Sequence, residues 1–234
     1  MLKRVAFVCA MPMELTPLKR LLPLEKTVVG SLEVYAGSLG DRAVVAIVTG
    51  IGSLLAAEGV ERLVKAIDVE HVVVVGITGA LDNDTPIGTV VMPAAVVNGA
   101  TGAEFRPRRL GGDTPSGKMW TSDKLITDLA VIAHLRANGV IALDMETATI
   151  AEFCQGRGIP WSVFRAISDR ATEVSLDDEV LELINRDGTF NVRKITTFIL
   201  KHPARLSSLA RTAKDARLAA AHAAAAAVSA VKSL

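Results

Sequence analysis

Short apolar runs and helical patterns alternate along the first 170 residues of the chain. Residues 5–9 form a continuous apolar run, which is typical of a strand that is covered on both faces. Residues 71–75 form the clearest run of this kind. Leu15, Leu18, Leu21 and Leu22 follow the first run and have helical spacing.

The same patterns predict the other elements. Ser53 is a suitable N-cap for the second helix. Two pairs of consecutive strands interrupt the alternation of strand and helix, which predicts a mixed, mostly parallel sheet with helices on both faces. We therefore expect an α/β fold of three αβα layers, in a single domain over residues 1–234 that closes with a helix at about 203–234. Strands are expected at 28–36, 42–48, 88–92, 95–97, 140–143 and 160–167, a regular pattern resumes at 118–121, and helices are expected at 13–22, 54–67, 123–137, 146–155, 176–184, 192–200 and 203–234.

Composition narrows the classes of function. The 26 basic and 25 acidic residues leave a formal charge of +1, which favours neither nucleic acid nor an anionic membrane as a partner. No run of about 20 apolar residues predicts an integral membrane segment, and the first apolar run is too short for a signal peptide, so we expect a cytoplasmic protein. Cys9 and Cys154 lie in predicted buried elements. A disulfide between them stays an alternative, but reduced core residues are the more usual outcome.

Two stretches depart from the regular pattern. Glycine, proline and arginine dominate residues 98–118, and a loop of this length in a compact domain is usually functional or mobile. The last predicted helices carry several basic residues, which fit either a contact with a membrane surface or, more commonly, a solvated helix face. These residues are Lys201, Arg205, Arg211, Lys214 and Arg217.

Three acidic residues, Glu14, Glu146 and Asp169, each follow a predicted strand in an apolar or small-residue context. Burying a polar group without a partner costs roughly 2–7 kcal/mol. Acidic residues at the carboxyl ends of three buried strands therefore indicate a shared crevice that carries chemistry. Each one alone also has an ordinary explanation, such as a solvated residue at a helix start for Glu14.

Neighbouring motifs support such a crevice. Glycine turns are predicted at 49–52 and 76–79, where free backbone N–H groups can hold an anion or a hydroxyl. Asp144 suits the N-cap of the following helix, which would leave Glu146 available. Arg165 and Asp169 lie four residues apart on one face of an extended strand, so the arginine could orient the aspartate or form a simple ion pair with it.

In combination, these motifs resemble the superfamily of purine nucleoside phosphorylases and 5′-methylthioadenosine/S-adenosylhomocysteine nucleosidases, which implies a nucleoside phosphorylase-like fold. Two branches are the most similar: the nucleosidases, and a bacterial branch of hopanoid-associated phosphorylase-like proteins. The segment 201–203 and the alanine-bearing helix after it are closer to the second branch. The matching stretches, in the family's order, are 10–14, 49–52, 117–126, 143–148 and 165–169.

The resemblance implies a role for individual residues. Glu14 matches the glutamate that activates water, Asp169 matches the acid that protonates the purine at N7, and Glu146 matches the residue that hydrogen-bonds the ribose. These roles suit cleavage of an N-glycosidic bond, because its transition state resembles an oxocarbenium ion and the leaving purine needs a proton. The full set of residues expected to contact the substrate, besides the catalytic Glu14, Asp169 and Glu146, is Met145, Gly52, Thr78, Gly79, Leu125, Ile126 and Arg165.

The resemblance also bears on the second substrate. Val74 and Ile77 stand where the phosphorylases carry an arginine and a serine for phosphate, and this difference favours water. Thr78 and the arginines of the loop at 98–118 (Arg106, Arg108 and Arg109) could still supply a phosphate site, so phosphorolysis stays an alternative, as does nucleoside binding without catalysis. We expect that loop to border the 5′ side of the nucleoside. No metal or other cofactor and no nucleic acid is implied, and a homodimer is expected from the resemblance.

Overall fold

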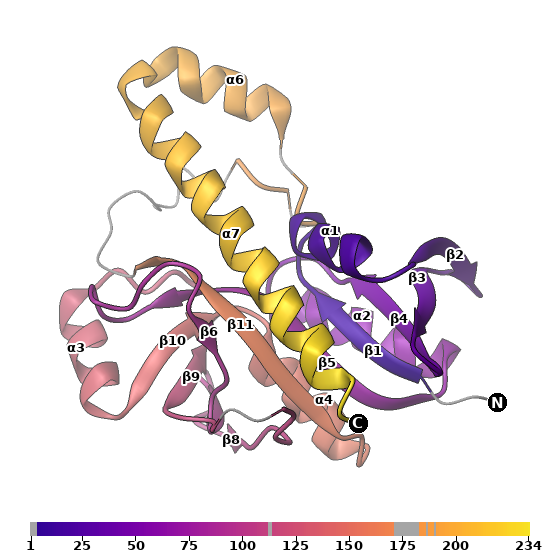
Figure 1. Cartoon of the computed structure of the whole chain (residues 1–234). Helices are drawn as coiled ribbons and strands as arrows, with labels where there is room; N and C mark the ends of the chain where they lie inside the picture. The colour runs from indigo at the N-terminus through magenta and orange to yellow at the C-terminus, as the bar shows by residue number, and fades with distance from the viewer. Residues whose placement is uncertain (1–3, 112–113, 171–182, 186, 190) are drawn as a thin grey trace.

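A mixed β-sheet runs through the centre of the molecule in the computed structural model, which describes residues 4–111, 114–170, 183–185, 187–189 and 191–234 (Figure 1). The strand order is β2-β3-β4-β1-β5-β10-β9-β7-β8, and β11 pairs with β5 and β6. The central pairs β1–β4, β1–β5 and β5–β11 are parallel, whereas β2–β3 and β3–β4 are antiparallel. The strands are β1 (Arg4–Cys9), β2 (Glu25–Val29), β3 (Leu32–Leu39), β4 (Arg42–Val48), β5 (Val69–Ala80), β6 (Val90–Val91), β7 (Ala95–Asn98), β8 (Glu104–Phe105), β9 (Lys118–Thr121), β10 (Val140–Asp144) and β11 (Trp161–Arg170).

Helices cover both faces of this sheet, so the expected α/β layers are confirmed (Figure 1). Alternation along β1 explains the layers, because Val5 and Phe7 belong to the core under α1 and α7, whereas Ala6 and Val8 belong to the core under α2 and α4. The helices are α1 (Pro12–Leu21), α2 (Ser53–Ala66), α3 (Leu129–Ala137), α4 (Thr147–Gly156), α6 (Val192–Lys201), the 3-10 helix η1 (Pro203–Arg205) and α7 (Leu206–Val231).

The long strand β5 changes partner along one of its edges. Its first half pairs with β1 as far as Val74, and its end pairs with β10 only from Gly79. On its other edge, β11 pairs with β5 from Val72 to Ala80. Between Val74 and Gly79, the first edge of β5 therefore has no neighbouring strand in the described part of the chain, and its backbone groups can bind side chains.

Several boundaries differ from the sequence-based predictions. The strand expected at 28–36 is two strands, β2 and β3, joined by a turn in which Gly30 has φ of 62°. The glycine turn expected at 76–79 is wrong, because β5 continues through it to Ala80. The strand expected at 88–92 is reduced to the two residues of β6. The helix expected at 176–184 lies mostly outside the described residues.

Helix starts account for two further corrections. The helix predicted at 123–137 begins only at Leu129, because Asp128 caps it by accepting a hydrogen bond from the backbone N–H of Ala130 at 2.8 Å. The segment 122–128 is therefore irregular. The N-cap of α2 is Gly52 and not Ser53, which is the first helical residue.

A buried polar chain closes the amino end of the central strands. His71 Nε2 lies 2.9 Å from Ser162 Oγ, and Ser162 Oγ donates to the Arg108 carbonyl at 2.5 Å. Because the single hydroxyl proton goes to that carbonyl, Nε2 of His71 carries a proton and donates it to Ser162. Burial, together with the positive charges of Arg108 and Arg42, lowers the pKa of His71 to about 4.

Cys9 and Cys154 are free and buried, and they lie in the two different cores. This agrees with reduced core residues rather than a disulfide. Within the described residues, no helix has the length and apolar character that a membrane span requires.

Candidate active site

A cavity of about 200 Å³ lies at the carboxyl ends of β1, β5, β10 and β11. Its position coincides with the gap between β1 and β10 on the edge of β5, which is the place where open α/β sheets bind ligands. Its lining residues are Ala10, Met11, Glu14, Ile51, Ile77, Thr78, Gly79, Ser122, Lys124, Leu125, Ile126, Thr127, Leu143, Asp144, Met145, Glu146, Arg165, Ser168, Asp169, Arg170 and Ile184.

Glu14 lies in the first turn of α1 and is fully buried. Its Oε2 accepts the backbone N–H groups of Ala10 at 2.8 Å and Met11 at 3.0 Å. Its Oε1 accepts the backbone N–H of Ile77 at 2.8 Å. This N–H group is available because Ile77 lies in the stretch of the β5 edge that has no neighbouring strand. A carboxylate offers about four lone-pair sites, so these three N–H groups leave one site open.

Gly76 provides the space for this carboxylate. A Cβ at this position would lie 2.3 Å from Glu14 Oε1 and 2.9 Å from Arg165 Nη1. Such contacts are far inside van der Waals separation, so a side chain here would displace both charged groups. The glycine in the 76–79 motif therefore serves close approach rather than a turn.

Glu146 reaches the same cavity from the start of α4. Its Oε1 accepts the backbone N–H of Gly52 at 3.0 Å, and its Oε2 accepts Nη2 of Arg165 at 2.9 Å. Gly52 has φ of 93°, a backbone conformation that residues other than glycine rarely adopt. The turn at 49–52 thus fixes Glu146 by a backbone donor, as an anion-binding turn would, while two lone-pair sites of Glu146 stay open.

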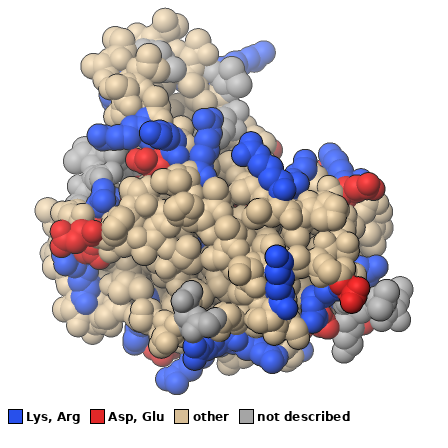
Figure 2. Space-filling model, in the orientation of Figure 1, with Lys and Arg blue, Asp and Glu red and all other residues tan. Residues whose placement is uncertain are grey.

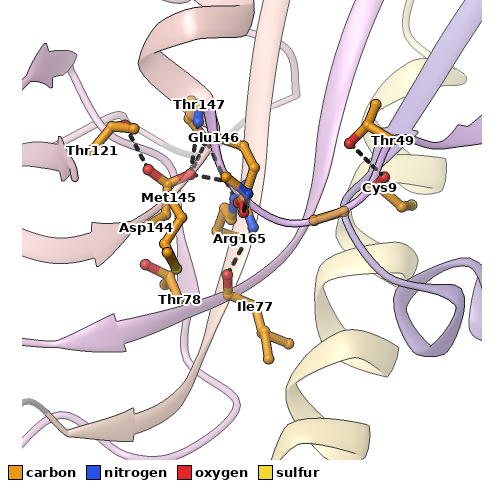
Figure 3. Close-up of polar contacts among 12 residues, drawn as sticks. Cys9, Thr49, Ile77, Thr78, Thr121, Asp144, Met145, Glu146, Thr147 and Arg165 are labelled. Carbon is orange, nitrogen blue, oxygen red and sulfur yellow. Dashed lines mark hydrogen bonds and ion pairs between the residues drawn. The ribbon is translucent and has the colours of Figure 1, made fainter. Parts of the chain in front are cut away.

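Arg165 joins the acidic residues (Figure 3). Its Nη2 lies 2.9 Å from both Asp144 Oδ2 and Glu146 Oε2, and its Nη1 lies 3.7 Å from Glu14 Oε1. The Nη1 group also donates to the Ile77 carbonyl at 2.9 Å. Burial lowers the pKa of Arg165, but Asp144, Glu146 and Glu14 outweigh that effect and raise it, so this guanidinium stays charged.

Asp144 holds the cluster to the scaffold. It accepts a hydrogen bond at 2.6 Å from Thr121 Oγ1, and it accepts both the hydroxyl and the N–H of Thr147, the latter at 2.9 Å. The predicted N-cap position is wrong, because Glu146 is the N-cap of α4. Asp144 nevertheless accepts the first N–H of that helix, from two residues further back. Asp144 is also a direct partner of Arg165, which the sequence analysis did not foresee.

Three carboxylates around one guanidinium carry excess negative charge in a buried site. Burial raises the pKa of Glu14, and Arg165 and three backbone N–H groups only partly offset this. Burial also raises the pKa of Glu146 to about 7, with Arg165 opposing the shift and Asp144 adding to it. Raised carboxylate pKa values of this kind suit groups that exchange protons near neutral pH.

Asp169 lies near the end of β11, beside Gly79 of β5. Its Oδ1 accepts the hydroxyl of Ser168 at 2.5 Å, and a Cβ at Gly79 would come within 3.1 Å of its Oδ2. The expectation that Arg165 orients Asp169 is wrong. The described contacts of Arg165 go to Glu14, Asp144, Glu146, Thr147 and Ile77, and none goes to Asp169.

The other predicted residues fall into two groups. The first group lines the cavity and consists of Thr78, Gly79, Leu125, Ile126 and Met145. Gly52 is not among the lining residues, and it contributes by donating its backbone N–H to Glu146.

Sequence reasoning missed several lining residues. Lys124 and Thr127 belong to the segment predicted as a helix at 123–137, Ser122 directly precedes that segment, and Arg170 directly follows Asp169. The nearest sequence signals were the neighbouring predicted residues Leu125, Ile126 and Asp169. Ile184 had no usable signal, since it was predicted only as the end of an acidic helix at 176–184.

The described residues of the loop at 98–118 lie away from this cavity. None of its described residues lines the cavity. Instead, β8 pairs with β7, and the N–H of Arg108 donates to the Trp161 carbonyl at 2.7 Å. Trp161 begins β11, so this segment packs at the amino end of the strand, opposite Asp169. The predictions that the loop borders the nucleoside and could supply phosphate-binding arginines therefore fail for this structure.

The fold and the site define the class of protein. A family model described as the phosphorylase superfamily matches residues 4–111 and 103–200, and the chain belongs to that superfamily. A curated relative from Exiguobacterium, named 5′-methylthioadenosine/S-adenosylhomocysteine nucleosidase, is 27% identical over 202 residues, which cover 73% of this chain and 87% of the relative.

Solved structures agree on the fold. A 5′-methylthioadenosine/S-adenosylhomocysteine nucleosidase of Helicobacter pylori aligns with a TM-score of 0.75 and 17% identity, over 100% of this chain and 99% of that one. A futalosine hydrolase of the same species aligns with a TM-score of 0.74 and 18% identity, over 100% and 99%. The resemblance found in the sequence and the predicted fold class are thus confirmed.

Proposed function

We propose that this chain is a hydrolase that cleaves the N-glycosidic bond of a purine nucleoside. The observation that carries the proposal is the convergence of Glu14, Glu146 and Asp169, from three distant parts of the sequence, on one cavity. The names of its relatives support the same reaction class, since both the nucleosidases and the futalosine hydrolase are hydrolases of nucleosides.

Glu14 is the group that activates water in this proposal. Glu14 lines the cavity, three N–H donors hold its carboxylate in place, and one lone-pair site is left for a water. Burial raises its pKa, which makes it a stronger base than an ordinary glutamate. A water bound there would be placed for attack at the anomeric carbon of a ribose held by Glu146.

Glu146 and Met145 hold the ribose. The two open lone-pair sites of Glu146 can accept hydrogen bonds from a pair of sugar hydroxyls, and the Met145 side chain supplies an apolar surface beside them. Negative charge next to the sugar also stabilises the oxocarbenium-like transition state. Asp169, half-buried beside Ser168 and lining the same cavity, protonates the departing base.

Electrostatics favour water over phosphate as the second substrate. Arg165 is the buried cation of the site, and it already faces Glu14, Asp144 and Glu146. A phosphate dianion placed beside these carboxylates would be repelled. Val74 is a core residue and Ile77 presents an apolar side chain to the cavity, so neither compensates.

A purine nucleoside modified at the 5′ position is the proposed substrate. Much of the cavity wall is apolar, including Met11, Ile51, Leu125, Ile126 and Ile184, and apolar walls favour the faces of a base and an uncharged 5′ group. The names of the relatives point to 5′-methylthioadenosine, S-adenosylhomocysteine or futalosine as first compounds to assay.

The test is a product analysis on these nucleosides and on adenosine and inosine, with and without inorganic phosphate. We expect free base and free ribose derivative at the same rate in both conditions. A ribose 1-phosphate product that forms only with phosphate would show a phosphorylase. Tight nucleoside binding in calorimetry without release of base over hours would show a binding protein.

We also propose a homodimer in the cytoplasm. Large apolar side chains lie exposed on the surface, among them Leu54 and Leu129, each 67% exposed, and exposed residues of this kind often mark interfaces between subunits. Light scattering after size-exclusion chromatography tests the dimer, and Leu54→Ser with Leu129→Ser should shift it toward monomer.

A further inference from the structure

The helical pair at the carboxyl end of the chain forms a protrusion that the proposed reaction does not use. We call residues 191–218 the basic hairpin; it consists of α6, η1 and the first half of α7. In Figure 1, α6 and the start of α7 extend away from the sheet, whereas the second half of α7 packs on it. This second half packs closely because it presents small apolar side chains to the sheet. Those buried there include Ala219, Ala220, Ala223 and Ala224.

Charge is distributed very unevenly between the basic hairpin and the remaining chain. Seven of the 26 basic residues but only one of the 25 acidic residues lie within it, so it carries +6 while the remaining residues carry −5. Figure 2 shows Lys and Arg side chains in a band across the face where the protrusion meets the body of the molecule. A near-neutral total charge therefore conceals one strongly cationic surface.

The basic hairpin is a folded unit rather than a loose tail. Phe198 and Leu183 are buried and pack with Ile195 and Leu209. The guanidinium of Arg205 lies 5.0 Å from the centre of the Phe198 ring. The helices that carry the outward side chains are thereby held together.

The outward faces combine cations with exposed leucines. On α6, Arg193, Lys194, Lys201 and Leu200 are exposed, and Leu200 is 78% exposed. On η1 and α7, the exposed positions include Leu206 at 50% and Leu218 at 43%, and the cations Arg211, Lys214 and Arg217 accompany them. A shallow hollow of about 400 Å³ is lined by Leu183, Arg193, Lys194, Thr197, Phe198, Lys201 and His202.

We propose that the basic hairpin docks on the surface of an anionic lipid bilayer. Clustered Lys and Arg on a helical surface attract anionic headgroups, and the hollow between the cations of α6 can receive a headgroup phosphate. The exposed leucines enter the boundary between headgroups and acyl chains. They distinguish a bilayer from nucleic acid, for which cations serve without exposed leucines and with exposed aromatic rings for stacking.

Docking would bring the catalytic cavity near the bilayer. Ile184 lines that cavity, and its neighbour Leu183 belongs to the apolar cluster that anchors the basic hairpin. The protrusion and the mouth of the cavity therefore share one side of the molecule, the carboxyl-end side of the sheet. The proposal does not depend on the reaction that the cavity performs.

The test is co-sedimentation of the full-length protein with phosphatidylcholine vesicles that contain or lack phosphatidylglycerol. We expect binding to the anionic vesicles only, and weaker binding as salt increases. Lys194→Gln, Lys201→Gln and Lys214→Gln together should lower the partition coefficient roughly 100-fold, because each cation contributes about fivefold. Leu200→Ser should lower it further, by up to roughly tenfold.

A matched control removes three lysines elsewhere. Lys26→Gln, Lys65→Gln and Lys118→Gln cause the same change in net charge, and these side chains are 59%, 65% and 42% exposed. We expect this variant to bind like the unmodified protein, with base release unchanged in both triple variants. Equal losses in both variants, equal binding to neutral vesicles, or no binding at low salt would overturn the proposal. So would preferential binding to single-stranded RNA.

Discussion

The two ends of β5 and β11 both bury polar side chains, yet they differ in charge and in access. At the amino end, His71, Ser162 and the Arg108 carbonyl form a chain without formal charge. At the carboxyl end, Arg165 faces Glu14, Asp144 and Glu146 beside a cavity. The same pair of strands thus carries a sealed structural cluster at one end and a charged, open one at the other.

The contrast teaches that burial of polar groups does not by itself mark a functional site. The amino-end chain satisfies its donors and acceptors internally, which is what stability requires. The carboxyl-end cluster keeps open lone pairs and excess negative charge, which costs stability unless a ligand uses them. The following variants test this difference.

The largest effect is expected from Glu14→Gln. Loss of the proposed base should lower the turnover number for base release about 1,000-fold, within the usual range for general-base catalysis. Glu70→Gln, at the amino end of β5, is the control and should leave turnover unchanged. Circular dichroism measures the fraction of Glu14→Gln that is unfolded. If the loss of turnover is no larger than this unfolded fraction accounts for, the catalytic role is contradicted.

Arg165→Met should have the next largest effect, on stability. It leaves three buried carboxylates without their cation, which costs about 3–5 kcal/mol in the free energy of unfolding. Arg42→Met removes the partly exposed pair with Glu70 at the amino end and should cost at most about 1 kcal/mol. Urea denaturation measures both, and similar losses in the two variants would show that the two ends are energetically alike.

Asp169→Asn should lower turnover on natural nucleosides about 100-fold while the protein stays folded. A nitrophenyl riboside releases a group that needs no protonation, so its cleavage should change far less. An equal loss on both substrates would remove Asp169 from the role of acid. Wild-type turnover on both substrates is the reference.

The smallest effects are opposite dependences of stability on pH. Glu146 has its pKa raised from 4.5 to about 7, so between these values the folded state holds a proton that the unfolded chain has lost, and the free energy of unfolding falls as pH rises. His71 has its pKa lowered from 6.5 to about 4, so in that window the unfolded chain holds the extra proton and the free energy of unfolding rises with pH.

Variants separate the two contributions. In Glu146→Gln, the free energy of unfolding should no longer fall between pH 4.5 and about pH 7 for this reason. In His71→Gln, it should no longer rise between about pH 4 and pH 6.5. Each change in slope is at most about 1.4 kcal/mol per pH unit. His71→Gln should keep its turnover at pH 7. Denaturation curves from pH 4 to pH 8 that run parallel in all three proteins would contradict both assignments.

The convergence of Glu14 and Asp169 was predictable from the sequence, because the carboxyl ends of the parallel strands β1 and β11 meet at one edge. Glu146 reaches the same place by another route, since it follows β10, which pairs antiparallel with the end of β5. The roles of Glu14, Glu146 and Asp169 stay predictions. The partners of Arg165 were not predictable: spacing along a strand suggested Asp169, but Asp144 and Glu146 approach from β10 and α4, and only the tertiary arrangement decides between local and distant carboxylates.

A glycine caused one of the other errors for a physical reason. A glycine after an apolar run usually indicates a turn, and Gly52 fits that rule. Gly76 does not, since it lies inside β5 and is small to admit Glu14. The irregular segment at 122–128 was hidden by its apolar residues, which resemble a helix face although they line a cavity.

Gly76 and Glu14 fill a single volume between them, since the carboxylate of one occupies the place of a side chain on the other. Positions 14 and 76 should therefore change together among relatives, and a smaller residue at 14 would allow a larger one at 76. Anyone redesigning this enzyme can use that exchange to deliver an acid from the strand instead of the helix, with the anionic group arriving from the opposite wall of the pocket.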